Sequence, residues 1–180
     1  WKVNFASRTQ MLDPSSYSKF FNLHVIAQDL EDKASQLQRL LARENLPVSE
    51  LVVYGELHGG SYPHKDVPKD NQSRAVQGKC FYSPKLSFKA FDVAFPGAED
   101  KTDHLTYQDR MLLVEQVFDV PRRWVGKVEN LLRLLPSIYE QGPGVDKGLP
   151  PIEGNIMEGV VLRPWNFHGQ DPVKVINPAY

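Results

Sequence analysis

Charged side chains stand inside otherwise apolar stretches of this sequence, and they are the residues best suited to chemistry. Four such charges fall in three stretches of strand-like composition: Glu56, Lys89, Asp92 and Glu158. Burying an unpaired carboxylate costs several kcal/mol, so these charges either face one another, a cation or a metal in a shared pocket, or lie solvated on edge strands.

The spacing within Phe88–Phe95 predicts which of these side chains share a face. Residues two apart in a strand point the same way, so Lys89 and Phe91 fall on one face and Asp92 on the other. The first face also takes Val93 and Phe95, and the second takes Phe88, Ala90 and Ala94. Asp92 is therefore expected to be a structural partner rather than a ligand contact.

Glu158 and Arg163 are five residues apart, which in a regular strand places them on opposite faces. Both reach one site only if the strand ends or bulges before Arg163. Pro164 favours an ending there.

Two amphipathic helices are predicted. The first runs from Leu23 to Asn45–Pro47, with an apolar face spaced three and four residues apart: Leu23, Ile26, Leu30, Ala34, Leu37 and Leu41. The second spans Thr106–Phe118, with Thr106 as its N-cap. Its inward residues are expected to be Met111, Val114 and Val117.

Five strands are predicted, at Trp1–Ala6, Leu51–Leu57, Phe88–Phe95, Trp124–Val128 and Glu158–Leu162, the last of them buried and final. Another apolar stretch follows at Leu131–Leu135. Residues 61–79 are read as a long loop and 141–154 as a Gly- and Pro-rich connection. This order predicts an α+β fold with mostly antiparallel sheets and flanking helices.

Composition excludes several classes of protein. The 180 residues carry a net charge of −1, unlike a strongly basic nucleic-acid binder, although a local basic groove is compatible with it. The single cysteine, Cys80, excludes an internal disulfide and a cysteine-rich zinc site. No apolar run reaches 18 residues, so no membrane span or membrane partner is expected.

Three motifs in order resemble those of the ATP-dependent nucleotidyltransferase superfamily of ligases and capping enzymes. They are Tyr54-Gly55-Glu56-Leu57-His58-Gly59-Gly60, Phe88-Lys89-Ala90-Phe91-Asp92-Val93 and Glu158-Gly159-Val160-Val161-Leu162-Arg163. The sequence is most similar to the nick-sealing RNA ligases, the group that includes the RNA-editing ligases. Three further stretches carry that likeness: Phe5-Ala6-Ser7-Arg8-Thr9, Met11-Leu12-Asp13-Pro14 and Val67-Pro68-Lys69.

The resemblance implies an ATP-grasp-like nucleotidyltransferase domain and an ATP-dependent RNA ligase. Such enzymes join an RNA 3′-hydroxyl to a 5′-phosphate through lysyl-AMP and RNA-adenylate, with magnesium assisting. It makes Glu158 and Glu56 catalytic, Glu158 at the metal site and Glu56 as a ribose or metal contact. Phe91 becomes the adenine-stacking ring, Arg8 and Arg163 phosphate contacts, and Lys89 a pocket residue beside the adenine.

Two departures from the family pattern stand out. No Lys-x-x-Gly motif, which holds the nucleophilic lysine, occurs in the sequence. After Arg163, Lys174 is the one remaining lysine, a poor match to the lysine-rich fifth motif. Residues 1–180 are therefore expected to form the central part of one nucleotidyltransferase domain, inactive alone, with the nucleophile upstream and the last lysine motif downstream.

Other functions remain open at this point. A DNA ligase or a capping guanylyltransferase shares the same motifs, and a non-catalytic nucleotide- or RNA-binding module would lack the nucleophile. The expected partners are RNA with nicked or apposed ends and an RNA-processing or editing complex. The expected compartment is mitochondrial for an editing ligase and otherwise cytoplasmic or nuclear. His58 is read as a turn residue, and Cys80 as structural.

Overall fold

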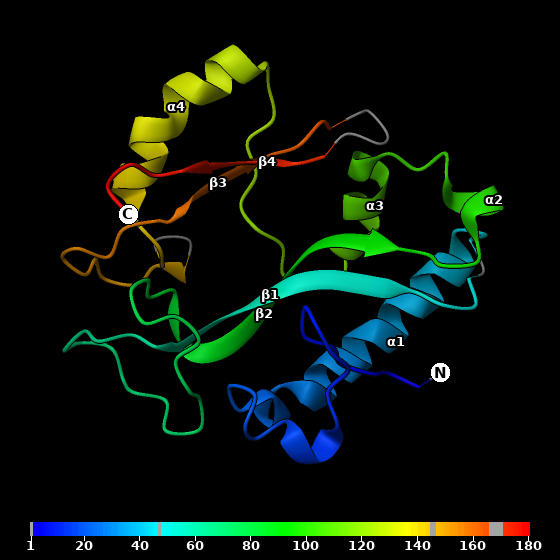
Figure 1. Cartoon of the computed structure of the whole chain (residues 1–180), viewed down its shortest axis with the longest axis horizontal. Coiled ribbons are helices and arrows are strands. Elements are labelled where there is room, and N and C mark those ends of the chain that lie inside the picture. Colours follow the sequence, from blue (N-terminus) through cyan, green and yellow to red (C-terminus); the bar gives the residue numbers. More distant parts are fainter. Residues whose placement is uncertain (1, 47, 145–146, 166–170) are drawn as a thin grey trace.

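The computed structural model describes residues 2–46, 48–144, 147–165 and 171–180. Two antiparallel hairpins organise it. Strand β1 (Val52–Ser61) pairs with β2 (Ser83–Ala94), and β3 (Gly159–Leu162) pairs with β4 (Val173–Ile176). With the helices, these two sheets form an α+β architecture, as the sequence predicts (Figure 1).

One face of the β1–β2 sheet is covered by helices α1 (Ala27–Arg43) and α3 (Tyr107–Val114) (Figure 1). The α1 side chains Leu37 and Leu41 are fully buried, as are Met111 and Val114 of α3. They meet Ala90, Val93 and other buried side chains in one apolar cluster, which is the core. The predicted inward faces of both helices are confirmed, with two exceptions. Ala34 of α1 is only partly buried, and Val117 lies beyond the end of α3 and is partly buried.

The helix boundaries differ from the sequence prediction. Leu23–Val25 forms a separate 3₁₀ turn, η2, because Ile26 has φ −117° and ψ 0°, and α1 begins only at Ala27. Helix α3 ends at Val114 instead of Phe118. Its predicted N-cap is confirmed, since Thr106 and Asp109 form a reciprocal capping box. Pro47, predicted to end the first helix, lies outside the described residues.

Two strand predictions were wrong. Of the predicted strand Trp1–Ala6, Trp1 is not described and residues 2–5 are irregular. Ala6 forms a single bridge with Met11 across the tight turn that follows. Residues 124–127 are irregular, with Val125 64% exposed, and Val128 begins a helix, α4 (Val128–Gln141). A strand needs a neighbouring edge, and in the described structure none pairs with this segment.

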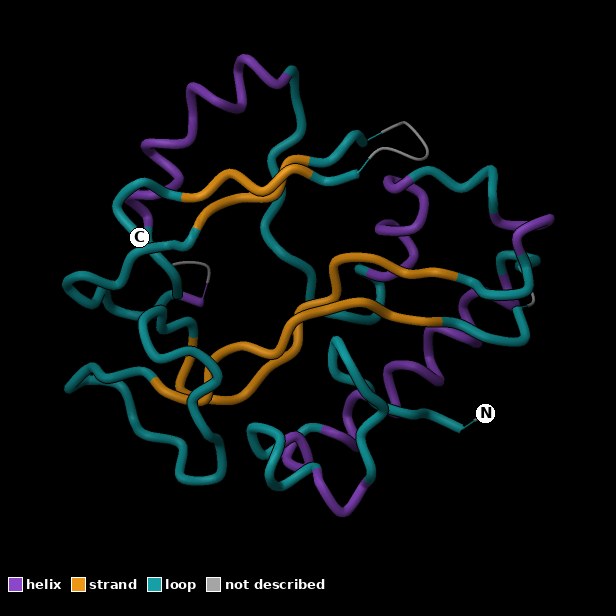
Figure 2. Tube along the Cα trace, viewed as in Figure 1, coloured by secondary structure: helices purple, strands orange, loops and turns teal. Residues whose placement is uncertain are grey.

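Strand β3 is confirmed at Gly159–Leu162, but it is neither buried nor final. Val161 is 55% exposed, because a single two-stranded hairpin leaves one side uncovered, and β4 follows it. Two other short elements complete the described chain, the 3₁₀ turn η1 (Pro14–Ser16) and helix α2 (Glu99–Thr102). Long loops connect the strands, including the predicted loop after β1 and the connection after α4 (Figure 2).

The β3–β4 hairpin and α4 lie on the opposite side of the β1–β2 sheet from α1 (Figure 1). The two parts still touch, because the Gln108 N–H of α3 donates to the Trp165 carbonyl oxygen after β3 at 3.2 Å. None of the described helices is long and apolar enough to cross a membrane.

Candidate active site

A β-bulge in β2 determines which side chains leave the core. Tyr54 pairs with Asp92 and Gly55 pairs with Ala90, so Phe91 has no partner residue on β1. The extra residue reverses the alternation, and both Ala90 and Val93 point into the core. We call the opposite side of the β1–β2 sheet its polar face.

The bulge corrects the period-2 assignment made from the sequence. Asp92 does not lie opposite Phe91, because one arginine, Arg163, contacts both side chains. Val93 and Phe95 do not share a face with Phe91 but belong to the core. Four side chains lie together on the polar face once the bulge is taken into account: Glu56, Lys89, Phe91 and Asp92.

Asp92 is the centre of an ion-pair network between three elements. Its Oδ1 accepts from Arg110 Nε of α3 at 3.1 Å, and its Oδ2 accepts from Arg163 Nη1 at 2.9 Å. The Asp92 side chain is only 19% exposed, so these pairs are poorly screened by solvent. The structural role predicted for Asp92 is therefore confirmed, although its predicted direction is not.

Arg163 lies just past the end of β3. The strand therefore ends before Pro164, as the sequence predicts. Its guanidinium carbon is 5.7 Å from the centre of the Phe91 ring and 5.0 Å from that of Tyr107. The Tyr107 hydroxyl donates to the Phe91 carbonyl oxygen at 3.1 Å. Arg163 thus joins the β3–β4 hairpin to the polar face beside the predicted adenine-stacking ring.

Glu158 flanks the other end of β3. It forms an ion pair with Lys174 of β4, and both side chains are about half exposed. The Glu158 charge also helps to raise the pKa of the buried Cys80 and of the partly buried Tyr82, both just before β2. Burial is the larger cause of both shifts.

Glu56 acts on the same two groups. Its carboxylate also contributes to the raised pKa of Cys80 and of Tyr82, and Gln77 Nε2 donates to it at 3.4 Å. Lys89 stands directly opposite Glu56 in the strand register, without an ion pair between them in the described structure. The charges of Glu56 and Glu158 thus both act on Cys80 and Tyr82, while Arg163 and Phe91 meet at the far end of β3.

Arg8 is not brought into these contacts. It is exposed in a turn, in which the Ser7 N–H donates a hydrogen bond to the Gln10 carbonyl oxygen at 2.8 Å. Within the residues that the structure describes, Arg8 forms no ion pair or side-chain hydrogen bond.

His58 is a buried strand residue, so the turn role predicted for it was wrong. Its ring packs edge-on against Tyr82 at 5.5 Å between centroids, and it is 5% exposed. Neither ring nitrogen has a hydrogen-bond partner in the described structure. Burial, together with the charges of Lys147 and Lys89, lowers the pKa of His58 to about 3, so the ring is neutral at pH 7.

The carboxylates fit a magnesium ion that is shared with phosphates rather than a closed metal centre. Among the described residues, no group of three or more His, Cys, Asp or Glu side chains is arranged to hold a metal. Mg²⁺ is commonly bound through one or two carboxylates plus substrate phosphates. Glu158 and Glu56 meet that requirement, and both are open to solvent.

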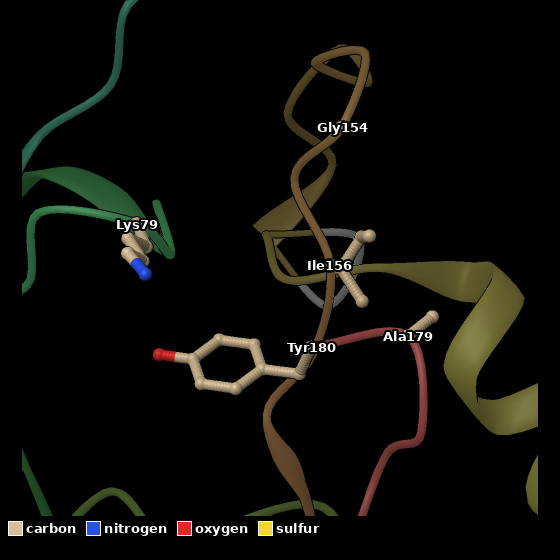
Figure 3. Close-up of a pocket in the computed structure, with 5 residues that line it drawn as sticks. All are labelled: Lys79, Gly154, Ile156, Ala179 and Tyr180. Atoms are coloured by element: carbon tan, nitrogen blue, oxygen red, sulfur yellow. The ribbon is translucent and has the colours of Figure 1, made fainter.

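Two shallow pockets occur in the described structure, and neither includes Phe91, Glu56 or Glu158. One of about 260 Å³ lies beside the last residues of the chain, where Tyr180 and Lys79 approach Gly154, Ile156 and Ala179 (Figure 3). The other, of about 240 Å³, lies over the start of β2.

Several residues of this region were missed by the sequence reasoning. Tyr107 and Arg110 stand three apart on α3, a spacing that places both on one side of a helix. This spacing could have been used to predict that both side chains leave the core, because Met111 and Val114 occupy the buried side of the same helix. No comparable sequence signal marks Asn155. Its side chain forms hydrogen bonds with both the N–H and the carbonyl oxygen of Phe81, each at 2.8 Å.

Comparison with known proteins gives a consistent result. Residues 2–176 match the family model for RNA ligase. The chain is 30% identical to "RNA-editing ligase 1, mitochondrial" of Trypanosoma brucei brucei over 194 residues, which cover 89% of this chain and 39% of that protein. It is 28% identical to "RNA-editing ligase 2, mitochondrial" of the same organism (strain 927/4 GUTat10.1) over 183 residues, or 89% of this chain and 43% of that protein. The chain spans about two fifths of the length of these relatives.

Proposed function

Because the chain belongs to the RNA ligase family, we propose that it forms the nucleotide-binding centre of an ATP-dependent RNA ligase. The observation that carries this proposal is the polar face of the β1–β2 sheet. There the bulge presents an aromatic ring beside Arg163, with Glu56 on the same face, and Glu158 flanks the other end of β3.

Different residues of the site contact the adenine base, the phosphates and the metal ion. Phe91 stacks on the adenine, an interaction that is worth about 1–3 kcal/mol per base. Lys89 borders the adenine from the same face. Arg163 contacts a phosphate through the N–H groups that Asp92 leaves unused, and Arg8 supplies a second phosphate contact.

Glu56 contacts the ribose or a metal, and Glu158 is the metal-site carboxylate. When bound, magnesium neutralises phosphate charge during transfer. Displacing the Lys174 ammonium frees the Glu158 carboxylate for that role, and the half-exposed pair costs little to open.

Three in-line displacements at phosphorus make up the reaction. A lysine amine attacks the α-phosphorus of ATP and expels pyrophosphate, an RNA 5′-phosphate oxygen then takes the AMP from lysine, and an RNA 3′-hydroxyl finally attacks the 5′-phosphorus. That last step forms the phosphodiester, breaks the bond to AMP, and gives the hydroxyl proton to solvent. We place the attacking lysine outside these 180 residues, because none of their lysines stands in a Lys-x-x-Gly motif.

The RNA substrate has nicked or apposed ends. The relatives are named as mitochondrial RNA-editing ligases, and this supports a mitochondrial location and an editing or related RNA-processing complex for this chain.

Sealing of a nicked RNA duplex that already carries a 5′-adenylate tests the proposal, since it bypasses the missing lysine. We expect a longer protein that adds the upstream lysine to residues 1–180 to seal this substrate with magnesium, whereas residues 1–180 alone should acquire no covalent label from radioactive ATP. Phe91→Ala should lower sealing about tenfold or more through lost stacking, while Phe91→Trp keeps an aromatic face.

Equal sealing by the Ala and Trp variants would remove Phe91 from the site. No sealing of the adenylated duplex by the longer protein would contradict the proposed function. A covalent AMP label lost in Lys89→Ala or Lys174→Ala would show that the nucleophile lies within the chain.

A further inference from the structure

Tyr107, the first residue of α3, has no role in the proposed reaction, yet it contacts two residues of the proposed nucleotide site. Its hydroxyl donates to the Phe91 carbonyl oxygen at 3.1 Å. The centre of its ring lies 5.0 Å from the guanidinium carbon of Arg163. One side chain thus touches both the predicted adenine-stacking residue and a predicted phosphate contact.

The hydroxyl of Tyr107 acts on the bulge of β2. Phe91 has no partner residue on β1, so its backbone lies outside the regular hydrogen-bond ladder of the hairpin. The preceding residue also finds a partner beyond the hairpin, since the Ala90 N–H donates to the Asp119 carbonyl oxygen at 2.8 Å. Two contacts therefore hold the bulge, one from the start of α3 and one from the segment beyond its end.

The Tyr107 hydroxyl is a donor throughout the neutral pH range. Burial raises its pKa above the ordinary value, although the nearby Arg163 acts in the opposite direction. The proton therefore stays on the oxygen, and the hydrogen bond to the Phe91 carbonyl oxygen does not depend on pH near 7.

The ring of Tyr107 forms part of the surface on which Arg163 rests. The Arg163 guanidinium lies over both the Tyr107 and the Phe91 rings, and a cation is attracted electrostatically to an aromatic face. The Tyr107 ring is itself held in place, because Trp165 meets it edge-on at 5.6 Å between centroids. The direction of Arg163 therefore depends on this ring as well as on its ion pair with Asp92.

We propose that Tyr107 is a positioning residue of the nucleotide site, which fixes Phe91 through its hydroxyl and Arg163 through its ring. This inference rests on the proposed function, because Phe91 and Arg163 are the residues that would contact the nucleotide. Groups that are already ordered in the binding geometry lose less freedom when the ligand arrives. Loss of either Tyr107 contact should therefore weaken nucleotide binding, although no group that touches the nucleotide is removed.

The test uses the longer protein with the upstream lysine, after pyrophosphate has removed any AMP from that lysine. Its ligand is α,β-methylene-ATP, which cannot transfer AMP because a carbon atom replaces the bridging oxygen after the α-phosphorus. Calorimetry measures the Kd in the presence of magnesium. Circular dichroism and thermal unfolding check that each variant folds.

Two substitutions separate the hydroxyl from the ring. Tyr107→Phe removes only the hydroxyl, and Tyr107→Leu removes the aromatic ring as well. Tyr62→Phe is the matched control, because the Tyr62 hydroxyl also donates to a backbone carbonyl oxygen, that of Pro150, at 2.5 Å. In the described structure Tyr62 makes no such contact with Phe91 or Arg163.

Tyr107→Phe should weaken binding of the analogue about threefold to tenfold, as expected for the loss of one hydrogen bond. Tyr107→Leu should weaken it by a further factor of about two or more, because the attraction between the ring and Arg163 is also lost. Tyr62→Phe should leave the Kd unchanged.

Double-mutant cycles distinguish positioning from a general structural role. In a Phe91→Ala protein the hydroxyl has no ring to position, so Tyr107→Phe should not change the Kd further. In an Arg163→Gln protein, Tyr107→Phe and Tyr107→Leu should bind the analogue equally. Losses of the same size in all backgrounds, or Tyr107 variants that match Tyr62→Phe, would overturn the positioning role.

The sealing assay with adenylated RNA keeps this result separate from the proposed function. A protein that binds the analogue and seals, while its Tyr107 variants match Tyr62→Phe, loses only the positioning role. A protein that shows the coupled losses in binding but does not seal loses only the ligase proposal. Absence of analogue binding by the unmodified protein would overturn both.

Discussion

Asp92 shows how one carboxylate can organise a functional face without touching a ligand. It holds Arg110 from α3 and Arg163 from the end of β3, and Arg163 in turn rests on Phe91. An arginine pinned in this way has lost most of its rotamer freedom before any phosphate arrives. The position of the Arg163 guanidinium therefore depends on Asp92, which contacts it at 2.9 Å.

His58 should give the folded chain a distinct pH dependence. Its folded pKa of about 3 lies below the ordinary value of 6.5, so between these limits the unfolded chain binds a proton that the folded chain does not. The stabilisation by neutral His58 is complete above pH 6.5 and is lost as the pH falls toward 3. At most the loss is about 1.4 kcal/mol per pH unit.

Replacing this ring by phenylalanine removes the titration while keeping a buried aromatic. Between pH 7 and 4.5, the unfolding free energy of the native chain should fall by about 2–3 kcal/mol more than that of His58→Phe. Urea unfolding at both pH values measures the difference. Parallel losses in the two proteins would show that His58 is not held neutral in the fold.

At the residue scale, sequence reasoning identified most of the polar face but not its geometry. The charges of Glu56, Lys89 and Glu158 were recognisable because each interrupts an apolar stretch. The burial of His58 was not, since a histidine followed by two glycines is equally typical of a turn. Its position depends on contacts with Tyr82, which is distant in sequence.

At the element scale, the β1–β2 hairpin depends on Gly55 lacking a side chain. A Cβ atom there would lie 2.1 Å from Phe88 Cζ and 2.6 Å from the Lys89 carbonyl oxygen. The Phe88 ring packs against Phe118 in the core and has little room to retreat. The hairpin thus needs a glycine beside the bulge for space, not for an unusual dihedral angle.

Gly55→Ala should destabilise the chain by about 1–3 kcal/mol through overpacking. Gly78→Ala is a matched control, because a Cβ atom at that position meets no atom within 4 Å. Thermal unfolding of both variants checks the prediction. A Gly55→Ala chain as stable as Gly78→Ala would show that Phe88 and the Lys89 backbone yield easily.

Elements with a clear local pattern were predictable, and those defined by distant partners were not. The Thr106 cap and the apolar spacing of α1 follow from a few neighbouring residues. Helix α4 contains Pro136, whose presence argues against a helix in the sequence. Strand β4 is only four residues long and exists through its pairing with β3.

At the scale of the whole molecule, the two hairpins are joined at both ends of β3. Arg163 and Asp92 form one junction. At the other, Asn155 accepts from Phe81 N–H and donates to the Phe81 carbonyl oxygen, both at 2.8 Å. Asn155 is buried, so water does not readily replace these bonds.

Asn155→Ala should cost about 2–4 kcal/mol, because it leaves the Phe81 N–H and carbonyl without partners. Hydrogen exchange should also accelerate in β3 and β4 more than in α1. Asn4→Ala, at an exposed position, serves as the control. Equal exchange in Asn155→Ala and Asn4→Ala would show that the second junction does not depend on this amide.

The bulge at Phe91 has a consequence for how such a chain can change over generations. Point substitutions alter what a position offers, but a deletion or an insertion near residue 91 alters the direction in which every following side chain of β2 points. Losing one residue there would turn Val93 outward and send a charged neighbour into the core. The segment should therefore accept exchanges of residue type far more readily than changes of length.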